Sequence, residues 1–429
     1  MERQAMKHLL RWKNKKTRKP LILRGARQVG KTWIMKEFGK RYFKYTAYIN
    51  LDKNRNMLDV FKQDYDIKRI ILAINIETGV KIEPNETLII FDEIQENPDA
   101  LSALKYFCED APEYAVIAAG SLLGVAIHKG VSFPVGKVDT LELHPLSYRE
   151  FLSAVGEEGL ATLLEKQDYG MMEIFHEKYI DWLKKYYYIG GMPEVVSNFI
   201  EENDFKEVRY IQNRIIELYE QDFGKHTPND ELPRIRMVWD SIPLQLAKEN
   251  KKFFFGKIKE GARAKDFEVS IEWLKDCGLI KKVHNVSKPF MPLKAYIDFS
   301  AFKIYMLDVG LLGTLSGLSA KTILEGTNIF VEFKGALTEQ YVLQQLVSDT
   351  EYEPYYYTES KSEGEIDFII QKETSIVPVE VKAKENLRAK SLRVYCDKFK
   401  PELAVRTSMS KYREQEWMVN IPLYCISTL

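Results

Sequence analysis

A short segment near the N-terminus, Gly25-Ala-Arg-Gln-Val-Gly30-Lys31-Thr32, constrains the fold more than any other part of the chain. It follows an apolar strand segment at 20–23 and precedes a sequence with helical spacing of apolar residues. Glycines let backbone N–H groups wrap around phosphate oxygens, and a helix N-terminus adds positive potential. The segment therefore predicts a phosphate-binding loop between a strand and a helix of a parallel α/β sheet.

The predicted cofactors are ATP and Mg²⁺. Lys31 would reach the β and γ phosphates, and the Thr32 hydroxyl would bind Mg²⁺. A second segment, ETLIIFDEIQENP at 86–98, reads as a buried strand that ends in Asp92-Glu93. Asp92 would help to hold Mg²⁺, and Glu93 would act as the general base that polarises the attacking water. The residues predicted to contact ATP are Gly25, Ala26, Arg27, Gln28, Val29, Gly30, Lys31, Thr32 and Asp92.

Alternating strands and helices extend this pattern to about residue 143. Strands are expected near 20–24, 44–51, 87–92, 114–120 and 137–143, and helices near 31–43, 56–79 and 98–110. The fourth strand ends in Ser121, where a polar side chain could sense the γ-phosphate or position the water. A serine in this place can equally be a turn or helix-cap residue.

In the middle of the chain, the alternation of strands and helices gives way to a mainly helical pattern. Apolar residues recur at helical spacing up to about residue 226, and this predicts a helical lid at 149–228. A helix, a second helix followed by a strand in DFEVSIEWLKDCGLIKKVHNV at 266–286, and a strand pair in LKAYIDFSAFKIYMLD at 293–308 then follow. This is the order of a winged helix-turn-helix domain, expected at 229–318. A basic cluster in this region could contact DNA phosphates or be merely solvated; it comprises Lys248, Lys251, Lys252, Lys257, Lys259, Arg263 and Lys265.

The segment EGEIDFIIQKETSIVPVEVKAK at 363–384 reads as a hairpin of two apolar strands. Glu380 and Lys382 lie two residues apart, so they share one face of their strand, and pairing would bring Asp367 beside them. Carboxylates are hard oxygen ligands for Mg²⁺, and a nearby lysine can stabilise charge or orient water. The cluster is either a metal-dependent nuclease centre or a sheet edge with charged residues.

Composition excludes some classes of protein. The 429 residues include 62 Lys+Arg and 62 Asp+Glu, so no overall positive charge points to nucleic acid. The 4 cysteines are scattered without metal-ligand spacing, which is typical of the reduced cytoplasm. No apolar run reaches the roughly 18–20 residues of a membrane helix, so we expect a cytoplasmic protein without a membrane partner.

With these parts in order, the chain resembles prokaryotic AAA-type P-loop ATPases that end in a domain of unknown function similar to PD-(D/E)XK nucleases. The resemblance is carried by GARQVGKT, LIIFDEIQ, AAGSLLG, LHPLSYREF, YYYIGGMPEVV, Gln221-Asp222-Phe223, WDSIPLQLAKENKKF, KIYMLDVGLL, GALTEQYV, EIDFII and VEVKA. It implies a P-loop ATPase core at 1–148 and a nuclease-like α/β domain at 319–429, after the lid and the winged helix.

The resemblance also implies roles for single residues. Lys31, Thr32, Asp92 and Glu93 correspond to the ATP site. On the nuclease-type positions, Glu339, Asp367 and Glu380 would be metal ligands and Lys382 a catalytic cation. One departure is Gly136-Lys137, where many relatives have Gly-Arg. An arginine finger cannot be chosen among Arg149, Arg209, Arg214 and Arg234.

Three functions remain open at this point. The chain could be an ATP-driven enzyme in which hydrolysis gates a nuclease acting on DNA. It could be a nucleotide switch whose C-terminal region binds DNA or a protein partner without cutting. It could also be a structural ATPase whose C-terminal domain serves only as an interaction surface, with self-association as one outcome. All three bind ATP.

Overall fold

The computed structural model of the chain describes residues 2–121, 133–227, 230–248, 251–325, 331–359, 364–383 and 389–429. These residues form two compact units. The N-terminal unit comprises residues 2–144 together with 276–278, and the C-terminal unit comprises 145–275 and 279–429. Apart from 276–278, the regions expected as lid, winged helix and nuclease-like domain therefore lie in one unit.

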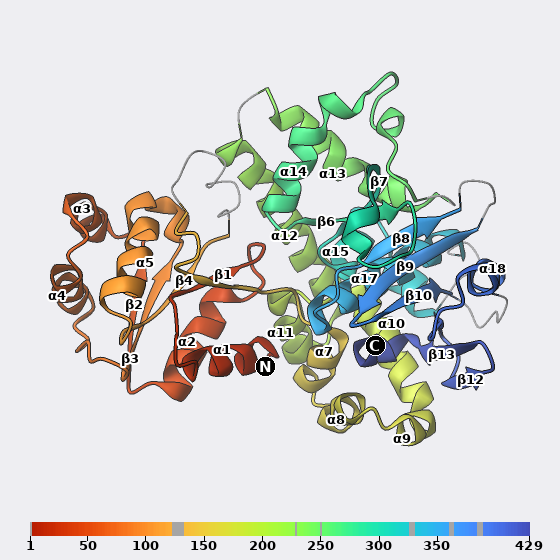
Figure 1. Cartoon of the computed structure of the whole chain (residues 1–429), viewed down its shortest axis with the longest axis horizontal. Helices are drawn as coiled ribbons and strands as arrows, with labels where there is room; N and C mark the ends of the chain where they lie inside the picture. Colours follow the sequence, from red (N-terminus) through yellow and green to blue (C-terminus); the bar gives the residue numbers. More distant parts are fainter. Residues whose placement is uncertain are drawn as a thin grey trace. The chain divides into compact units, whose positions relative to one another are not determined.

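A parallel sheet of five strands forms the centre of the N-terminal unit, in the order β2-β3-β4-β1-β5 (Figure 1). All neighbouring strands pair in parallel, as predicted. The central strands β3 and β4 are buried along their whole length, which is typical of parallel sheets covered by helices. The strands are β1 (Leu21–Arg24), β2 (Tyr45–Asn50), β3 (Thr87–Asp92), β4 (Ala115–Ala119) and β5 (Asp139–Glu142).

Helices connect these strands and form the core with them. Ile89 and Phe91 of β3 belong to a buried cluster to which α3, α4 and α5 contribute, including Phe61 and Leu104. The ring centroid of Phe38 on α2 lies 6.4 Å from that of Trp12 on α1. The helices are α1 (Ala5–Lys13), α2 (Lys31–Tyr42), α3 (Arg55–Gln63), α4 (Ile67–Thr78) and α5 (Pro98–Asp110).

The single helix expected at 56–79 is wrong: the structure has two helices, α3 and α4. Asp64 is fully extended, and its side chain accepts a hydrogen bond from the Asp66 N–H at 2.9 Å. The Asp66 side chain in turn caps α4 by accepting from the Lys68 N–H at 2.9 Å. Aspartate side chains that bond to nearby backbone N–H groups compete with helix continuation, so the chain stops and restarts here.

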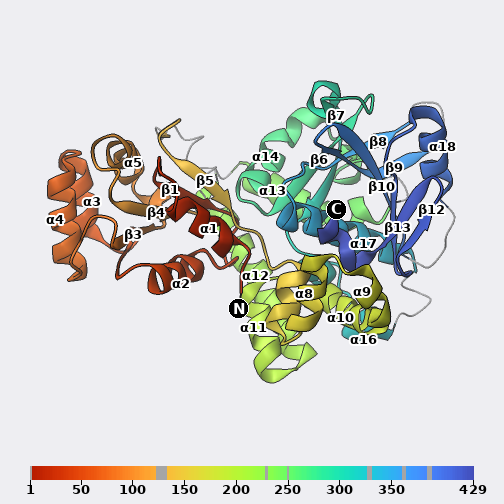
Figure 2. The ribbon, with the colours of Figure 1, turned by 60° about the horizontal axis from the view of Figure 1, so that its bottom comes forward.

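Six helices open the C-terminal unit, as the helical pattern predicts, and Figure 2 shows α8 to α11 grouped together. They are α7 (Tyr148–Ala154), α8 (Glu158–Lys166), α9 (Tyr169–Ile174), α10 (His176–Ile189), α11 (Pro193–Glu202) and α12 (Phe205–His226). Later helices are α13 (Leu232–Leu246), α14 (Glu268–Asp276), α15 (Val309–Leu315), α16 (Ala320–Glu325), α17 (Val331–Asp349) and α18 (Lys390–Phe399).

The second sheet has eight strands in the order β12-β13-β11-β10-β9-β8-β6-β7. Its hairpin β9–β10 is antiparallel, with Val379 opposite Phe368. β6 pairs with β8 in parallel at Asn285–Tyr356, and Asn285 Oδ1 also accepts from the Thr358 N–H at 3.2 Å. The strands are β6 (Ile280–Val286), β7 (Ile297–Met306), β8 (Tyr355–Thr358), β9 (Glu365–Lys372), β10 (Ser375–Val381), β11 (Val405–Ser408), β12 (Arg413–Gln415) and β13 (Met418–Pro422).

The expected strand pair within 293–308 is also wrong. This segment contains a 3-10 turn, Leu293–Tyr296, and one whole strand, β7, whose antiparallel partner is β6. The order α13, α14, β6, β7 agrees with the order expected for a winged helix, but the β6–β7 hairpin forms one end of the eight-stranded sheet. The winged-helix assignment stays a prediction.

One buried carboxylate joins distant parts of the C-terminal unit. Asp308 Oδ2 accepts from the Gly191 N–H at 2.6 Å and from Gln344 Nε2 at 3.0 Å, and its Oδ1 accepts from the Leu311 N–H at 3.0 Å. Gly190 has a φ of 73°, and a Cβ there would lie 2.1 Å from Asp308 Oδ1. The turn between α10 and α11, the start of α15 and the middle of α17 are thus fixed to each other.

Candidate nucleotide site and a C-terminal acidic cluster

The phosphate-binding loop connects β1 to α2 through backbone conformations that favour glycine. Gly25 has a φ of 139° and Gly30, at the N-cap of α2, has a φ of 95°. A Cβ on Gly25 would lie 2.2 Å from the carbonyl oxygen of Leu143, so a side chain does not fit there. Gln28 also has a positive φ, of 66°. The loop is therefore held in a tight curve directly before the first turn of the helix.

Lys31 turns back onto this loop. Its Nζ donates to the carbonyl oxygens of Gly25 at 2.8 Å and Ala26 at 2.7 Å. Burial lowers the pKa of Lys31 to about 8, although the carboxylates of Glu93 and Asp92 act in the opposite direction. The ammonium group thus lies beside the backbone that would surround a phosphate.

Asp92 lies buried at the carboxyl end of β3 and accepts three hydrogen bonds. Its Oδ2 accepts from Thr32 Oγ1 at 2.7 Å and from the Tyr48 hydroxyl at 2.9 Å, and its Oδ1 accepts from the Glu93 N–H at 3.1 Å. Burial and the Asp92 charge raise the pKa of Tyr48 to about 12. The structure therefore brings together Thr32 and Asp92, the two residues predicted to bind Mg²⁺ beside the phosphates.

Glu93 and Ser121 meet at the ends of neighbouring strands. Glu93 Oε2 accepts from Gln95 Nε2 at 2.6 Å and from Ser121 Oγ at 3.4 Å. Ser121 Oγ accepts from Arg27 Nε at 3.2 Å, which connects the phosphate loop to the end of β4. Glu93 itself has a φ of 52°, an unusual conformation that is often found at functional sites.

The C-terminal cluster gathers side chains from one helix and two strands. Glu339 lies on α17, Asp367 on β9 and Glu380 on β10. Asp367 Oδ2 accepts from the Val381 N–H at 2.7 Å, and Glu380 Oε1 lies 2.6 Å from Lys382 Nζ. The hairpin thus places these groups at one end of the strands, as the i, i+2 spacing and the pairing predict.

Two further lysines enter this cluster. The fully buried Lys303 of β7 pairs with Glu365 and lies 3.8 Å from Glu339 Oε2. Lys251 pairs with Glu339 Oε1, and the Tyr305 hydroxyl donates to Glu339 Oε2 at 3.2 Å. Both oxygens of Glu339 are therefore occupied by protein groups.

Together, burial and the neighbouring charges raise the pKa of Lys303 and Asp367 and lower that of Glu339. Burial works against the charge of Lys303, but the carboxylates of Glu365, Glu339 and Asp367 outweigh it and raise its pKa. Burial and the neighbouring Glu339 charge raise the pKa of Asp367 to about 8. Burial likewise opposes the charge of Glu339, but Lys251 and Lys303 outweigh it and keep the pKa of Glu339 low.

Comparison with known proteins identifies the N-terminal part. Residues 17–152 match the family model of an AAA domain. This confirms the predicted AAA-type P-loop ATPase class for the N-terminal region. Residues 180–322 and 334–426 match two domains of unknown function, DUF8612 and DUF4143. Neither of these two descriptions names an activity, so the nuclease-like resemblance stays a prediction.

Several solved structures are similar to the chain at low identity. A Walker-type ATPase of Pyrococcus abyssi has 15% identity and a TM-score of 0.48, with 73% of this chain and 95% of that one covered. The Orc1 protein of Aeropyrum pernix in complex with DNA has 13% identity and a TM-score of 0.26, covering 73% and 90%. Cdc6p of Pyrobaculum aerophilum has 11% identity and a TM-score of 0.26, covering 75% and 93%. A search of curated proteins found no match.

No group of three or more His, Cys, Asp or Glu side chains in the described ranges is placed to hold a metal ion. Within the same ranges, no helix is both long and apolar enough to cross a membrane.

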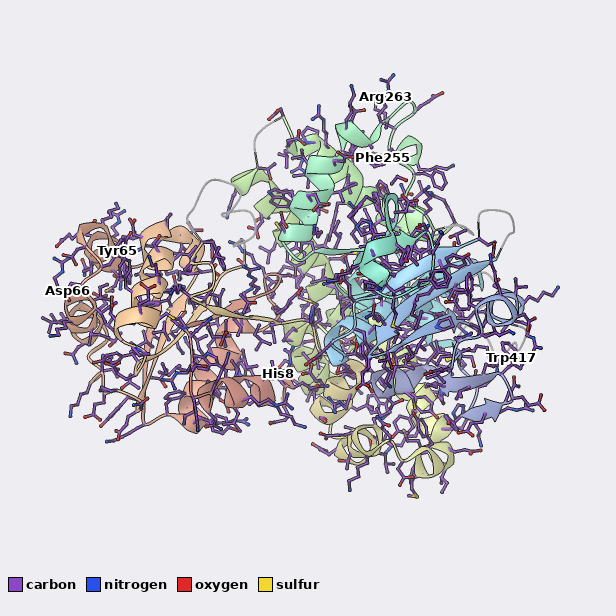
Figure 3. The ribbon with its side chains drawn as sticks, viewed as in Figure 1. His8, Tyr65, Asp66, Phe255, Arg263 and Trp417 are labelled. Atoms are coloured by element: carbon purple, nitrogen blue, oxygen red, sulfur yellow. The ribbon has the colours of Figure 1, made fainter. Side chains whose placement is uncertain are left out.

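The predicted basic cluster divides into two parts. Lys251 points inward to Glu339, whereas Lys257, Lys259, Arg263 and Lys265 are exposed. Figure 3 labels Phe255 and Arg263 on this segment, which runs between α13 and α14. The exposed residues keep DNA contact open as a prediction.

The remaining cations with predicted roles have partners. Lys137 pairs with Glu109 at 2.7 Å on the surface. Arg214 and Arg234 pair with Glu194 and Glu231, respectively, and Arg149 lies 3.9 Å from both Glu165 and Asp349. Arg209 lies in a pocket described below. None of these contacts selects an arginine finger.

Sequence reasoning missed the residues that support both sites. Tyr48 and Gln95 hold Asp92 and Glu93, but a tyrosine on a strand and a glutamine in a turn carry no specific signal. Lys303 does carry one, because a lysine within the apolar run AFKIYML is unusual for a buried strand. Its carboxylate partners come from residues far along the chain, so the pattern could not name them.

We expect the affinity for ATP to fall as the pH rises above about 8. The pKa of Lys31 is about 8 in the protein alone, and phosphate charge favours its protonated form, so the pKa is higher in the complex. Above this pH, binding must take up a proton, and affinity falls by up to about tenfold per pH unit. Calorimetry in buffers of different protonation enthalpy measures the uptake.

Lys40→Met is the matched control, because Lys40 is an exposed lysine of the same helix. It should leave the pH dependence unchanged. An ATP affinity that stays constant between about pH 7 and about pH 9 would contradict a Lys31 pKa in that range.

Proposed function

We propose that the chain is a Mg²⁺-dependent ATPase whose nucleotide state controls DNA binding or cleavage by its C-terminal nuclease-like region. The observation that carries the ATPase part is the contact network at the strand ends. Thr32 bonds to Asp92, and Ser121 connects Arg27 of the phosphate loop to Glu93. These are groups that phosphoryl transfer to water needs: a metal ligand pair, a base and a polar positioning residue.

Thr32 and Asp92 would hold Mg²⁺, since their oxygens already lie 2.7 Å apart. When bound, the ion would neutralise charge on the phosphates. The backbone of residues 25–32 would bind the phosphate oxygens, and Lys31 would exchange its contacts with Gly25 and Ala26 for the β and γ phosphates. Exchange is favourable because a phosphate oxygen is a charged acceptor and a carbonyl oxygen is not.

Glu93 would act as the general base, and Ser121 would position it. Gln95 and Ser121 both bond to Glu93 Oε2, which fixes the orientation of the carboxylate. The other carboxylate oxygen, Oε1, is then the natural acceptor for a proton from water. Because Asp92 makes its bonds to Thr32 and Tyr48 without Glu93 side-chain atoms, the binding and catalytic roles can be separated by substitution.

Substitutions at Lys31 and Glu93 should have different effects. Lys31→Ala removes the cation from the loop and should abolish most ATP binding. Glu93→Gln keeps the shape of the side chain but removes the base, so ATP should bind at near-parental affinity while turnover falls by about 10²–10⁴-fold. Nucleotide binding by calorimetry and single-turnover hydrolysis measure the two quantities.

Glu96→Gln provides the matched control, because it makes the same chemical change at an exposed neighbour. Parental turnover in Lys31→Ala would refute the nucleotide site. A Glu93→Gln protein that loses ATP affinity but hydrolyses bound ATP normally would exchange the roles of Asp92 and Glu93.

For the nuclease-like site, the described residues fit Mg²⁺ in part. Glu380 Oε2 is buried and has no hydrogen-bond partner among the described residues, and Asp367 lies on the neighbouring strand. These two carboxylates would hold the ion, with Lys382 beside them and Glu339 as the third ligand. A bound Mg²⁺ would neutralise negative charge on a phosphodiester and lower the pKa of a water molecule bound to it.

A second candidate, DNA or partner binding without cleavage, is favoured by the lysines. Lys251 and Lys303 already neutralise Glu339, which leaves this carboxylate without a free oxygen. In a buried cluster, lysine charge can replace metal charge, and the carboxylates then have a structural role rather than a catalytic one. The two candidates differ in whether a divalent ion can displace Lys251.

Removing the Lys251 charge should distinguish them. If Glu339 is a metal ligand, Lys251→Met should raise Mn²⁺ affinity by about tenfold or more in the absence of nucleotide, because the competing ammonium is gone. Lys257→Met, an exposed lysine of the same segment, should have no effect. Mn²⁺ binding is measured by calorimetry.

Glu380→Gln should abolish this Mn²⁺ binding in the Lys251→Met background. If Mn²⁺ binds neither Lys251→Met nor the parent protein, the proposal of a metal-dependent nuclease is refuted, and the second candidate, binding without cleavage, remains.

A further inference from the structure

A pocket of about 620 Å³ lies in the C-terminal unit, away from the acidic cluster. It is formed by α12, the end of α10, and the connection from α15 to α16. Its size falls within the range of small-molecule sites, which is roughly 300–1,000 Å³. The pocket is therefore large enough for a small molecule.

One part of the wall is cationic. Lys206 and Arg209 come from α12, and Lys321 comes from α16. Lys206 and Lys321 are exposed, and the described residues that line the pocket include no Asp or Glu. The positive charge at this place is consequently not neutralised from within the lining.

Arg209 is the central group. Its Nη2 donates to the Leu318 carbonyl at 2.6 Å, its Nη1 donates to Thr314 Oγ1, and its Cζ lies 4.5 Å from the ring centroid of Tyr188. In the part of the chain that the structure describes, no carboxylate pairs with it. Burial lowers the pKa of Arg209, which reflects the cost of a half-buried charge that has only neutral partners.

Apolar and polar residues form the rest of the wall, and the polar ones are Asn213, Thr314 and Ser319. Phe205 lies with its ring centroid 5.5 Å from that of Tyr188, and Leu318 and Ala320 are half-buried beside it. A guanidinium has five N–H donors in a planar fork, and the bonds from Arg209 to Thr314 and Leu318 use only part of them. An anion at the pocket would receive charge-assisted hydrogen bonds from the remaining donors, while a ring would pack on Phe205 and Leu318.

We propose that this pocket binds a small aromatic anion, whose charged group contacts Arg209, Lys206 and Lys321 and whose ring packs against Phe205 and Leu318. The proposal is independent of the ATP site and of the nuclease-like cluster. It also gives Arg209 a role other than that of an arginine finger.

The probe for this site is anilinonaphthalene sulfonate, an aromatic sulfonate whose fluorescence rises on binding. It is titrated into the full chain with excess Mg²⁺-ADP, so that the nucleotide loop is not the site observed. We expect saturable binding that weakens about tenfold or more in Arg209→Met, because the methionine keeps the apolar stem and removes the charge. Phenylnaphthylamine, the same ring system without the sulfonate, should bind at least about tenfold more weakly than the sulfonate.

Arg214→Met is the matched control, since Arg214 lies on the same helix but pairs with Glu194 outside the pocket. It should leave the affinity unchanged. Lys206→Glu reverses an exposed charge without disturbing a buried contact, so it tests the pocket even if Arg209→Met is poorly folded; it should weaken the probe severalfold. Absence of saturable binding, equal affinity for the uncharged ring, or parental affinity in Lys206→Glu would overturn the proposal.

Discussion

Asp308 shows the constraint on which the C-terminal unit depends: a buried carboxylate must be surrounded by donors. Its two oxygens receive the N–H groups of Gly191 and Leu311 and the amide of Gln344, so segments more than a hundred residues apart are fixed at one point. Gln340 adds a second such contact by bonding both the N–H and the carbonyl of Met306. Loss of any partner would leave a buried polar group unpaired, at a cost of about 1–3 kcal/mol each. These bonds explain why helices 148–226 and the later sheet belong to one unit.

The same constraint gives the two candidate sites different chemistry. Asp92 is held by neutral donors, the hydroxyls of Thr32 and Tyr48, so its charge remains available to a cation. Glu339 is held by the ammonium groups of Lys251 and Lys303, so its charge is already neutralised. In the proposed ATP site, Asp92 would therefore be available to a metal ion, whereas the acidic cluster must lose a lysine before it can bind one at Glu339.

How far the sequence predicts this arrangement depends on the range of each signal. The loop at 25–32 and the strand ending at Asp92 are local patterns with strong backbone requirements, and the parallel sheet follows from them. The hairpin that holds Asp367 and Glu380 is also local, and its pairing was predictable from alternation and the short turn. The break at 64–66 was missed because side-chain capping by aspartates overrides a continuous helical pattern. The contacts of Lys251 and Lys303 with Glu339 were not predictable, because this partner lies far along the chain.

The central claim is that a working ATPase site serves a C-terminal region that acts on DNA. The measurement that tests it most directly is steady-state ATP turnover by the full chain, alone and with single-stranded or double-stranded DNA. We expect DNA to raise the turnover rate of the parent protein and to leave Lys31→Ala without activity. A parental rate that is the same with and without either form of DNA would contradict the coupling, and the chain would then be an ATPase that acts on another partner.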